Sequence, residues 1–112
     1  ILDSAKELGI KVKMGIVKTH DALFLESRFA HEGMEKRIAP WRELGVLAID
    51  NEVSAMLTVA SILGMQAGAV LVAVDNYTTG KAIDFDNEYD KLIADAIEVS
   101  TLALSKLIKA GQ

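Results

Sequence analysis

Asp50, Asn51 and Glu52 stand together directly after the apolar run 46–49, and a second apolar stretch follows them. A carboxylate at the end of a buried strand and the start of a helix is where α/β proteins commonly hold a small polar ligand. Such a carboxylate can accept hydrogen bonds from a ligand of this kind. Asp50 also suits a purely structural role, as the N-cap of the following helix.

Two more polar groups end apolar runs in the same way. Residues 19–21 (Thr-His-Asp) close the run 10–18, and Asp75 with Asn76 closes the run 67–74. If the strands are parallel, their carboxyl ends meet at one edge of the sheet, where ligands of open α/β sheets bind. We therefore expect the three polar groups to converge. For Asp75 and Asn76 the simpler alternative is a turn after a strand.

The elements that must position these residues follow from hydrophobic periodicity and from glycine and proline. Alternation of helices and strands predicts an α/β domain with a largely parallel sheet. The helix after Asn51 is apolar nearly all round and is expected to be buried. The predicted helices are 2–8, 40–45, 52–63 and 86–108, and the predicted strands are 10–18, 46–50 and 67–74.

Composition excludes several classes of protein. The chain has 112 residues, 51% of them hydrophobic, and a net charge of −4 with scattered cations, which argues against binding to nucleic acid. It has no cysteine, no apolar run of membrane-spanning length and no secretory signal in these residues, so we expect a cytoplasmic protein without disulfides. His20 and His31 lack the ligand spacing of a zinc site, so no metal is expected.

Three stretches, 15–24, 41–57 and 64–76, resemble in order and spacing the C-terminal half of the nucleoside phosphorylase family, and most closely the uridine phosphorylases. The resemblance implies a three-layer α/β/α phosphorylase-like fold with a central mixed, largely parallel sheet. It implies a pentosyltransferase that uses inorganic phosphate, without a cofactor, to cleave uridine into uracil and ribose 1-phosphate. Residues 1–112 are then a single domain or the C-terminal portion of a larger one.

The same resemblance implies roles for single residues. Glu52 matches the glutamate that accepts hydrogen bonds from the ribose hydroxyls, and Asn51 stands where the family usually has methionine. Asp50 matches a first carboxylate, with helix capping as an equal alternative. Thr19, at the preceding strand end, joins these residues as a substrate-binding candidate.

Base recognition is expected from the loop after that strand end. Leu23 and Phe24 match the stacking surface, while Glu26 and Arg28 match the side chains that read the edge of the base. An exposed salt bridge is the structural alternative for Arg28.

Asp75 and Asn76 are the candidate catalytic residues. Asp75 falls where purine nucleoside phosphorylases place the acid that protonates the base, and Asn76 falls where uridine phosphorylases have asparagine. A purine phosphorylase, or a nucleosidase on the same fold, is therefore the first alternative to a uridine phosphorylase. A non-catalytic module for nucleoside binding or assembly is the second.

The phosphate-binding arginines and glycine loop of the family have no counterpart in this sequence. We therefore expect the 112-residue chain to lack activity alone. The apolar helix 52–63 and the sheet edges of a half-domain favour a homo-oligomer, a hexamer or dimers thereof. Nucleoside and phosphate are the expected partners, with no nucleic acid polymer and no membrane.

Overall fold

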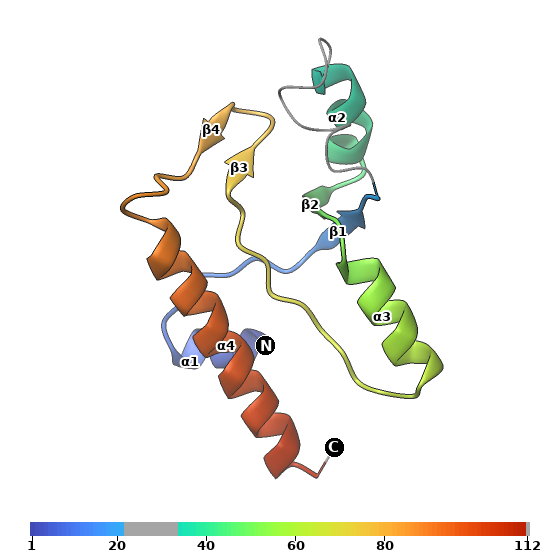
Figure 1. Ribbon diagram of the computed structural model, residues 1–112, viewed down its shortest axis with the longest axis vertical. Coiled ribbons are helices and arrows are strands. Elements are labelled where there is room, and N and C mark those ends of the chain that lie inside the picture. Colours follow the sequence, from blue (N-terminus) through green and yellow to red (C-terminus); the bar gives the residue numbers. More distant parts are fainter. Residues whose placement is uncertain (22–33, 112) are drawn as a thin grey trace. The chain divides into compact units, whose positions relative to one another are not determined.

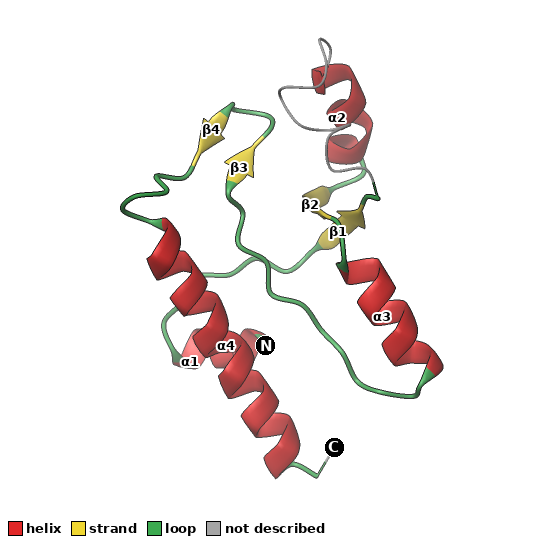
Figure 2. Ribbon diagram, viewed as in Figure 1, coloured by secondary structure: helices red, strands yellow, loops and turns green. Residues whose placement is uncertain are grey.

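The computed structural model describes residues 1–21 and 34–111, which fall into two compact units. The first unit comprises Ile1–Met14, Gly68–Val74 and Ala82–Gln112, and the second comprises Gly15–Ala67 and Asp75–Lys81. Figure 1 traces the chain through both units, and Figure 2 distinguishes helices from strands.

The first unit is built on two helices, α1 (Leu2–Glu7) and α4 (Tyr89–Lys109), which pack against each other. Apolar residues recur along one face of α4, as an amphipathic helix requires. The ammonium of Lys106 on α4 lies 2.7 Å from the Glu7 carboxylate on α1. Small side chains allow the close approach, and the buried residues of the two helices are Ser4, Ala5, Val99 and Ala103.

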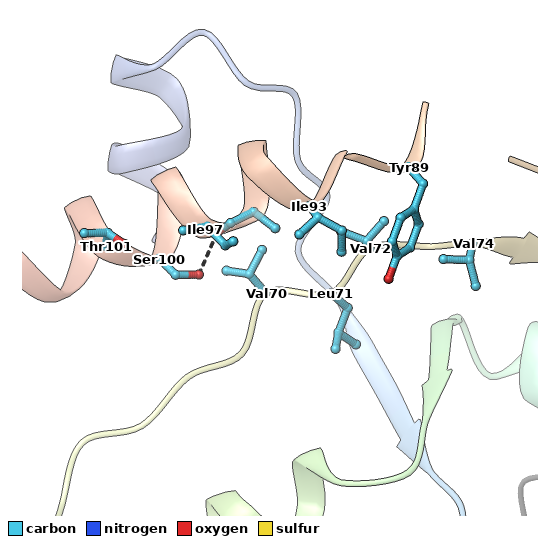
Figure 3. Close-up of a pocket in the computed structure, with 10 residues that line it drawn as sticks. Val70, Leu71, Val72, Val74, Tyr89, Ile93, Ile97, Ser100 and Thr101 are labelled. Carbon is cyan, nitrogen blue, oxygen red and sulfur yellow. Dashed lines mark hydrogen bonds between the residues drawn. The ribbon is translucent and has the colours of Figure 1, made fainter. Parts of the chain in front are cut away.

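An apolar groove of about 450 Å³ lies between α4 and the extended run 70–74 (Figure 3). Its lining includes Val70, Leu71 and Ile97, and few polar groups face it. The hydroxyl of Ser100 is already satisfied, because it donates to the carbonyl of Ala96 at 2.8 Å. The groove therefore resembles incompletely filled packing space more than a site for polar chemistry.

The second unit contains a parallel pair of strands, β1 (Ile16–Thr19) and β2 (Val46–Asp50), with helix α2 (Met34–Glu43) packed against β2. Helix α3 (Val53–Ile62) begins three residues after β2 ends. The predicted parallel pairing of the first two strands is confirmed, although β1 is shorter than the run 10–18.

The predicted third strand, 67–74, is wrong: these residues form neither a strand nor a helix. Short strands follow instead, β3 (Asp75–Asn76) and β4 (Lys81–Ala82), which form a separate two-stranded sheet. A continuous apolar run indicates burial, but a strand also requires a neighbouring backbone to pair with. Within the described residues, 67–74 has no such ladder, so the three-layer arrangement stays a prediction.

Two helix predictions also need correction. Helix α2 begins at Met34, not at Pro40, because the helix-forming residues before the proline extend it backwards. Helix α3 has the predicted position but is mostly exposed: Ala60 is buried, whereas Ile62 is 78% exposed. A helix that is apolar all round is stable in water only when other elements bury it, and the described elements bury little of α3. No helix among the described residues is long and apolar enough to cross a bilayer.

Candidate functional site

The ends of β1 and β2 meet at the start of α3, and the Asp50 carboxylate lies at their junction. One of its oxygens, Oδ1, accepts a hydrogen bond of 2.7 Å from the hydroxyl of Thr19. The other, Oδ2, accepts bonds from the backbone N–H groups of Glu52 at 3.0 Å and Val53 at 2.6 Å. These two N–H groups begin α3 and have no partner within the helix. Asp50 is not the N-cap residue itself, which is Glu52, but from two residues earlier it performs the structural role expected as the alternative, because it binds the first free N–H groups of the helix.

Three further bonds join the end of β1 and the residue after it to the end of β2 and the residues that follow. The Thr19 hydroxyl accepts the backbone N–H of Ser54 at 2.9 Å, while the side-chain amide of Asn51 donates to the His20 carbonyl at 2.6 Å. The backbone N–H of His20 donates to the Asp50 carbonyl at 2.7 Å. We call Thr19, His20, Asp50, Asn51 and Ser54 the strand-end cluster.

The cluster keeps the Asp50 carboxylate ionised. Partial burial acts to raise its pKa, but the hydrogen bonds from the Thr19 hydroxyl and from the Val53 and Glu52 backbone together lower that pKa below the ordinary 3.8. All three donors prefer a negatively charged acceptor, and the start of a helix adds a favourable partial positive charge.

The carboxylate of Glu52, unlike that of Asp50, is available to bind a ligand. Its side chain is exposed, and it makes no hydrogen bond or ion pair with residues 1–21 or 34–111. Its backbone N–H is nevertheless fixed by Asp50 Oδ2. The strand end therefore presents one bonded carboxylate and one exposed carboxylate, two residues apart.

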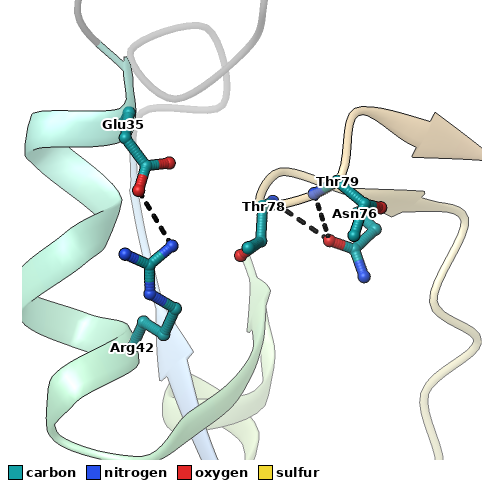
Figure 4. A network of polar contacts seen from close by, with 5 residues as sticks. All are labelled: Glu35, Arg42, Asn76, Thr78 and Thr79. Atoms are coloured by element: carbon teal, nitrogen blue, oxygen red, sulfur yellow. Dashed lines mark hydrogen bonds and ion pairs between the residues drawn. The ribbon is translucent and has the colours of Figure 1, made fainter.

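Asp75 and Asn76 lie on β3 and belong to the same compact unit. The carboxylate of Asp75 accepts the backbone N–H of Asn76 at 2.8 Å. The side-chain carbonyl of Asn76 accepts the N–H groups of Thr78 and Thr79, each at 3.0 Å (Figure 4). Gly80 closes the turn with a φ of +69°, which favours glycine. The turn expected as the simpler alternative is present, but β3 does not join the β1–β2 sheet, so the predicted single sheet edge is wrong.

A separate polar contact lies on α2, where the guanidinium of Arg42 is 2.8 Å from the Glu35 carboxylate (Figure 4). Both side chains are largely exposed, so the pair is worth little to stability. Trp41 of the same helix packs against Lys18 of β1, with the ammonium 5.0 Å from the ring centre. This contact ties α2 to the strand that carries Thr19.

The predicted base-recognition residues lie outside the described part of the chain: Leu23, Phe24, Glu26 and Arg28. His31 lies outside it as well. Within residues 1–21 and 34–111, no group of three or more His, Cys, Asp or Glu could hold a metal ion.

The sequence identified Thr19, Asp50, Asn51 and Glu52 as candidates. It did not show which of them make hydrogen bonds within the protein and which is exposed. The side chains of Thr19, Asp50 and Asn51 make hydrogen bonds that join the ends of the two strands and the start of α3. Among the four, only the Glu52 side chain is exposed and makes no hydrogen bond with the described residues. The backbone of Ser54 was missed, because a backbone donor leaves no signal in residue type. The Thr19–Asp50 contact could have been found only from the strand register.

The chain matches a family model described as the phosphorylase superfamily over residues 1–109. It is 31% identical to a DeoD-type purine nucleoside phosphorylase of Caldanaerobacter subterraneus over 99 residues, 88% of this chain and 39% of that protein. It is 35% identical to a protein of the same name from Bacillus cereus over 70% of this chain and 31% of that protein. The chain thus spans two fifths or less of these curated relatives. No solved structure matches it.

Proposed function

Since this chain belongs to the phosphorylase superfamily, we propose that it provides the sugar- and base-binding part of a nucleoside phosphorylase. In that reaction a phosphate oxygen attacks the anomeric carbon of the sugar while the bond to the base nitrogen breaks. The electron pair of that bond leaves with the base, which is then protonated. The products are the free base and ribose 1-phosphate.

The observation that carries the proposal is the exposed Glu52 carboxylate on a fixed backbone. A carboxylate can accept hydrogen bonds from two neighbouring ribose hydroxyls at once, which fixes the sugar. Its negative charge also favours the positive charge that develops on the sugar as the glycosidic bond lengthens. Asp50 is less suited to this task, because both of its oxygens already accept hydrogen bonds, three in all.

We infer that the base is a purine. The relatives at 31% and 35% identity are named as purine enzymes, although the sequence alone placed uridine first. Asp75 supports the purine because a carboxylic acid there could donate a proton to the departing base. Its Oδ1 accepts the backbone N–H of Asn76, which fixes the carboxyl group at the end of this strand.

We also propose a co-substrate, the origin of its binding groups and an oligomeric form. Inorganic phosphate would be the co-substrate, and its binding groups would come from residues outside this sequence. We accordingly expect the chain alone to bind nucleosides without cleaving them, and a homo-oligomer to be the working form.

A binding assay tests the proposal. The 112-residue chain is titrated with inosine and uridine, followed by NMR, and base release is measured with and without phosphate. We expect inosine to bind and no base to be released. Glu52→Gln should weaken inosine binding about tenfold or more, because one charged acceptor is lost, while Glu35→Gln on α2 serves as control. Binding of uridine alone would favour the pyrimidine reaction, and binding of neither nucleoside would contradict the proposal.

A further inference from the structure

The pairing of β1 with β2 contains an irregularity. Ile16 lies opposite Val46, but Val17 lies opposite Ala48, so Leu47 is an extra residue on β2. Bulges are rare in parallel pairs and often re-aim side chains near functional sites. Gly15 accommodates this one, since a Cβ there would lie 2.7 Å from Leu47 Cγ and still closer to Leu47 Cδ1.

The bulge determines what faces Thr19. After it, Lys18 lies opposite Ile49 and Thr19 opposite Asp50. Had the register of Ile16 continued unchanged, Thr19 would lie opposite Ile49, an apolar side chain. A one-residue slip also exchanges the two faces of a strand. The extra residue therefore brings the Thr19 hydroxyl to the Asp50 carboxylate.

The hydroxyl of Thr19 acts here as both donor and acceptor. A hydroxyl has one proton to donate, and that proton goes to Asp50 Oδ1, while a lone pair accepts the Ser54 N–H. Thr19 thus contacts the end of β2 and the first turn of α3 together. Glu52 lies between these two contacts in the chain.

We propose that Thr19 is a positioning residue, which fixes the backbone at Glu52 through its bonds to Asp50 and Ser54 rather than by contact with substrate. The proposal rests on the ribose-binding role of Glu52. It replaces substrate binding by Thr19, because the only proton of its hydroxyl is already donated.

Three variants of the full 112-residue chain test it. Thr19→Val keeps the shape of the side chain and removes both bonds, whereas Thr19→Ser keeps the hydroxyl. Thr58→Val is the matched control, because the Thr58 hydroxyl on α3 donates only to the Ser54 carbonyl, within the helix. Inosine affinity and the hydrogen exchange of the Glu52, Val53 and Ser54 amides are measured for each variant.

We expect Thr19→Val to weaken inosine binding about tenfold and to speed exchange of the three amides. Thr19→Ser should restore both, and Thr58→Val should change neither. Combining Thr19→Val with Glu52→Gln should weaken binding little further than Glu52→Gln alone, because both changes remove the same contact. Additive losses, or unchanged exchange in Thr19→Val, would overturn the positioning role. If the unmodified chain binds no nucleoside, the ribose role of Glu52 fails, while the exchange rates still test whether Thr19 holds this backbone.

Discussion

At the scale of single residues, two neighbouring carboxylates have opposite environments. Asp50 accepts three hydrogen bonds and is partly buried, whereas Glu52 is exposed. A change at Asp50 is therefore expected to affect folding first. A change at Glu52 should alter the free energy of unfolding by no more than about 0.5 kcal/mol, as is usual for exposed side chains without special contacts. Its main effect should be on ligand binding.

The lowered pKa of Asp50 predicts a dependence of stability on pH. A carboxylate with a lower pKa in the folded state stabilises the fold above the unfolded value of 3.8, and this contribution is lost as pH falls through the folded value. We expect Asp50→Asn to lower the free energy of unfolding by about 1 kcal/mol or more near neutral pH, since an amide has one acceptor oxygen where the carboxylate uses two, and a donor loses its partner. Urea unfolding at neutral and acidic pH measures both effects.

The variant should also lose less stability on acidification than the unmodified chain does, because the titrating group is gone. Asp3→Asn, at an exposed carboxylate in α1, is the control for the loss of one negative charge. An identical acid response in Asp50→Asn and the unmodified chain would show that Asp50 does not titrate with folding.

At the scale of elements, Gly15 and Leu47 together determine the register of β1 on β2. Gly15 is needed here for space and not for an unusual backbone angle, since its φ is not positive. The sequence signal for this feature was one glycine ahead of a strand, which indicates close approach but not the partner.

Gly15→Ala tests the packing at the bulge. The added Cβ collides with Leu47, so we expect a loss of about 1 kcal/mol in unfolding free energy. Leu47→Ala in the same chain should recover most of the loss by removing the colliding atoms. Gly68→Ala is the matched control, because a Cβ there meets only the end of the Ile1 side chain. Chemical denaturation of these three variants and of the unmodified chain tests the prediction. Equal losses of stability at Gly15 and Gly68 would contradict the role of the bulge.

At the scale of the whole molecule, apolar surface remains uncovered in both units. Among the described residues, Ile62 is 78% exposed on α3 and Ile108 is 65% exposed on α4. Monomeric proteins rarely leave large contiguous apolar surface in water. Such surface agrees with the expected homo-oligomer.

We accordingly predict that the chain self-associates. Sedimentation velocity should show an average mass that rises with concentration and with added sulfate, which strengthens apolar burial. Ile62→Lys and Ile108→Lys should each reduce the association, whereas Lys91→Ala, at an exposed salt bridge on α4, should not. A single monomeric species at all concentrations would contradict the prediction.

Periodicity and glycine placement in the sequence predicted most helices and the first two strands. They did not predict which distant backbone segments pair with each other. The helix that ends before Gly9, the long amphipathic helix α4 and the parallel pair β1–β2 were predictable from periodicity and glycine placement. The run 67–74 was not, because its apolar residues say nothing about which backbone lies beside it. In the site, residue types identified Asp50 and Glu52, but only the register separated the bonded carboxylate from the exposed one.

The bulge at Leu47 has a consequence for how this strand end tolerates change in length. The five residues of β2 lie alongside only four residues of β1. The extra residue of β2 determines that Thr19 pairs with Asp50 at the end of the two strands. An insertion of one residue within β2 that leaves the bulge in place would retain every polar side chain and still place Thr19 against Ile49. The geometry of this strand end is therefore encoded in a residue count as much as in residue identity, and insertions or deletions there should matter more than most substitutions.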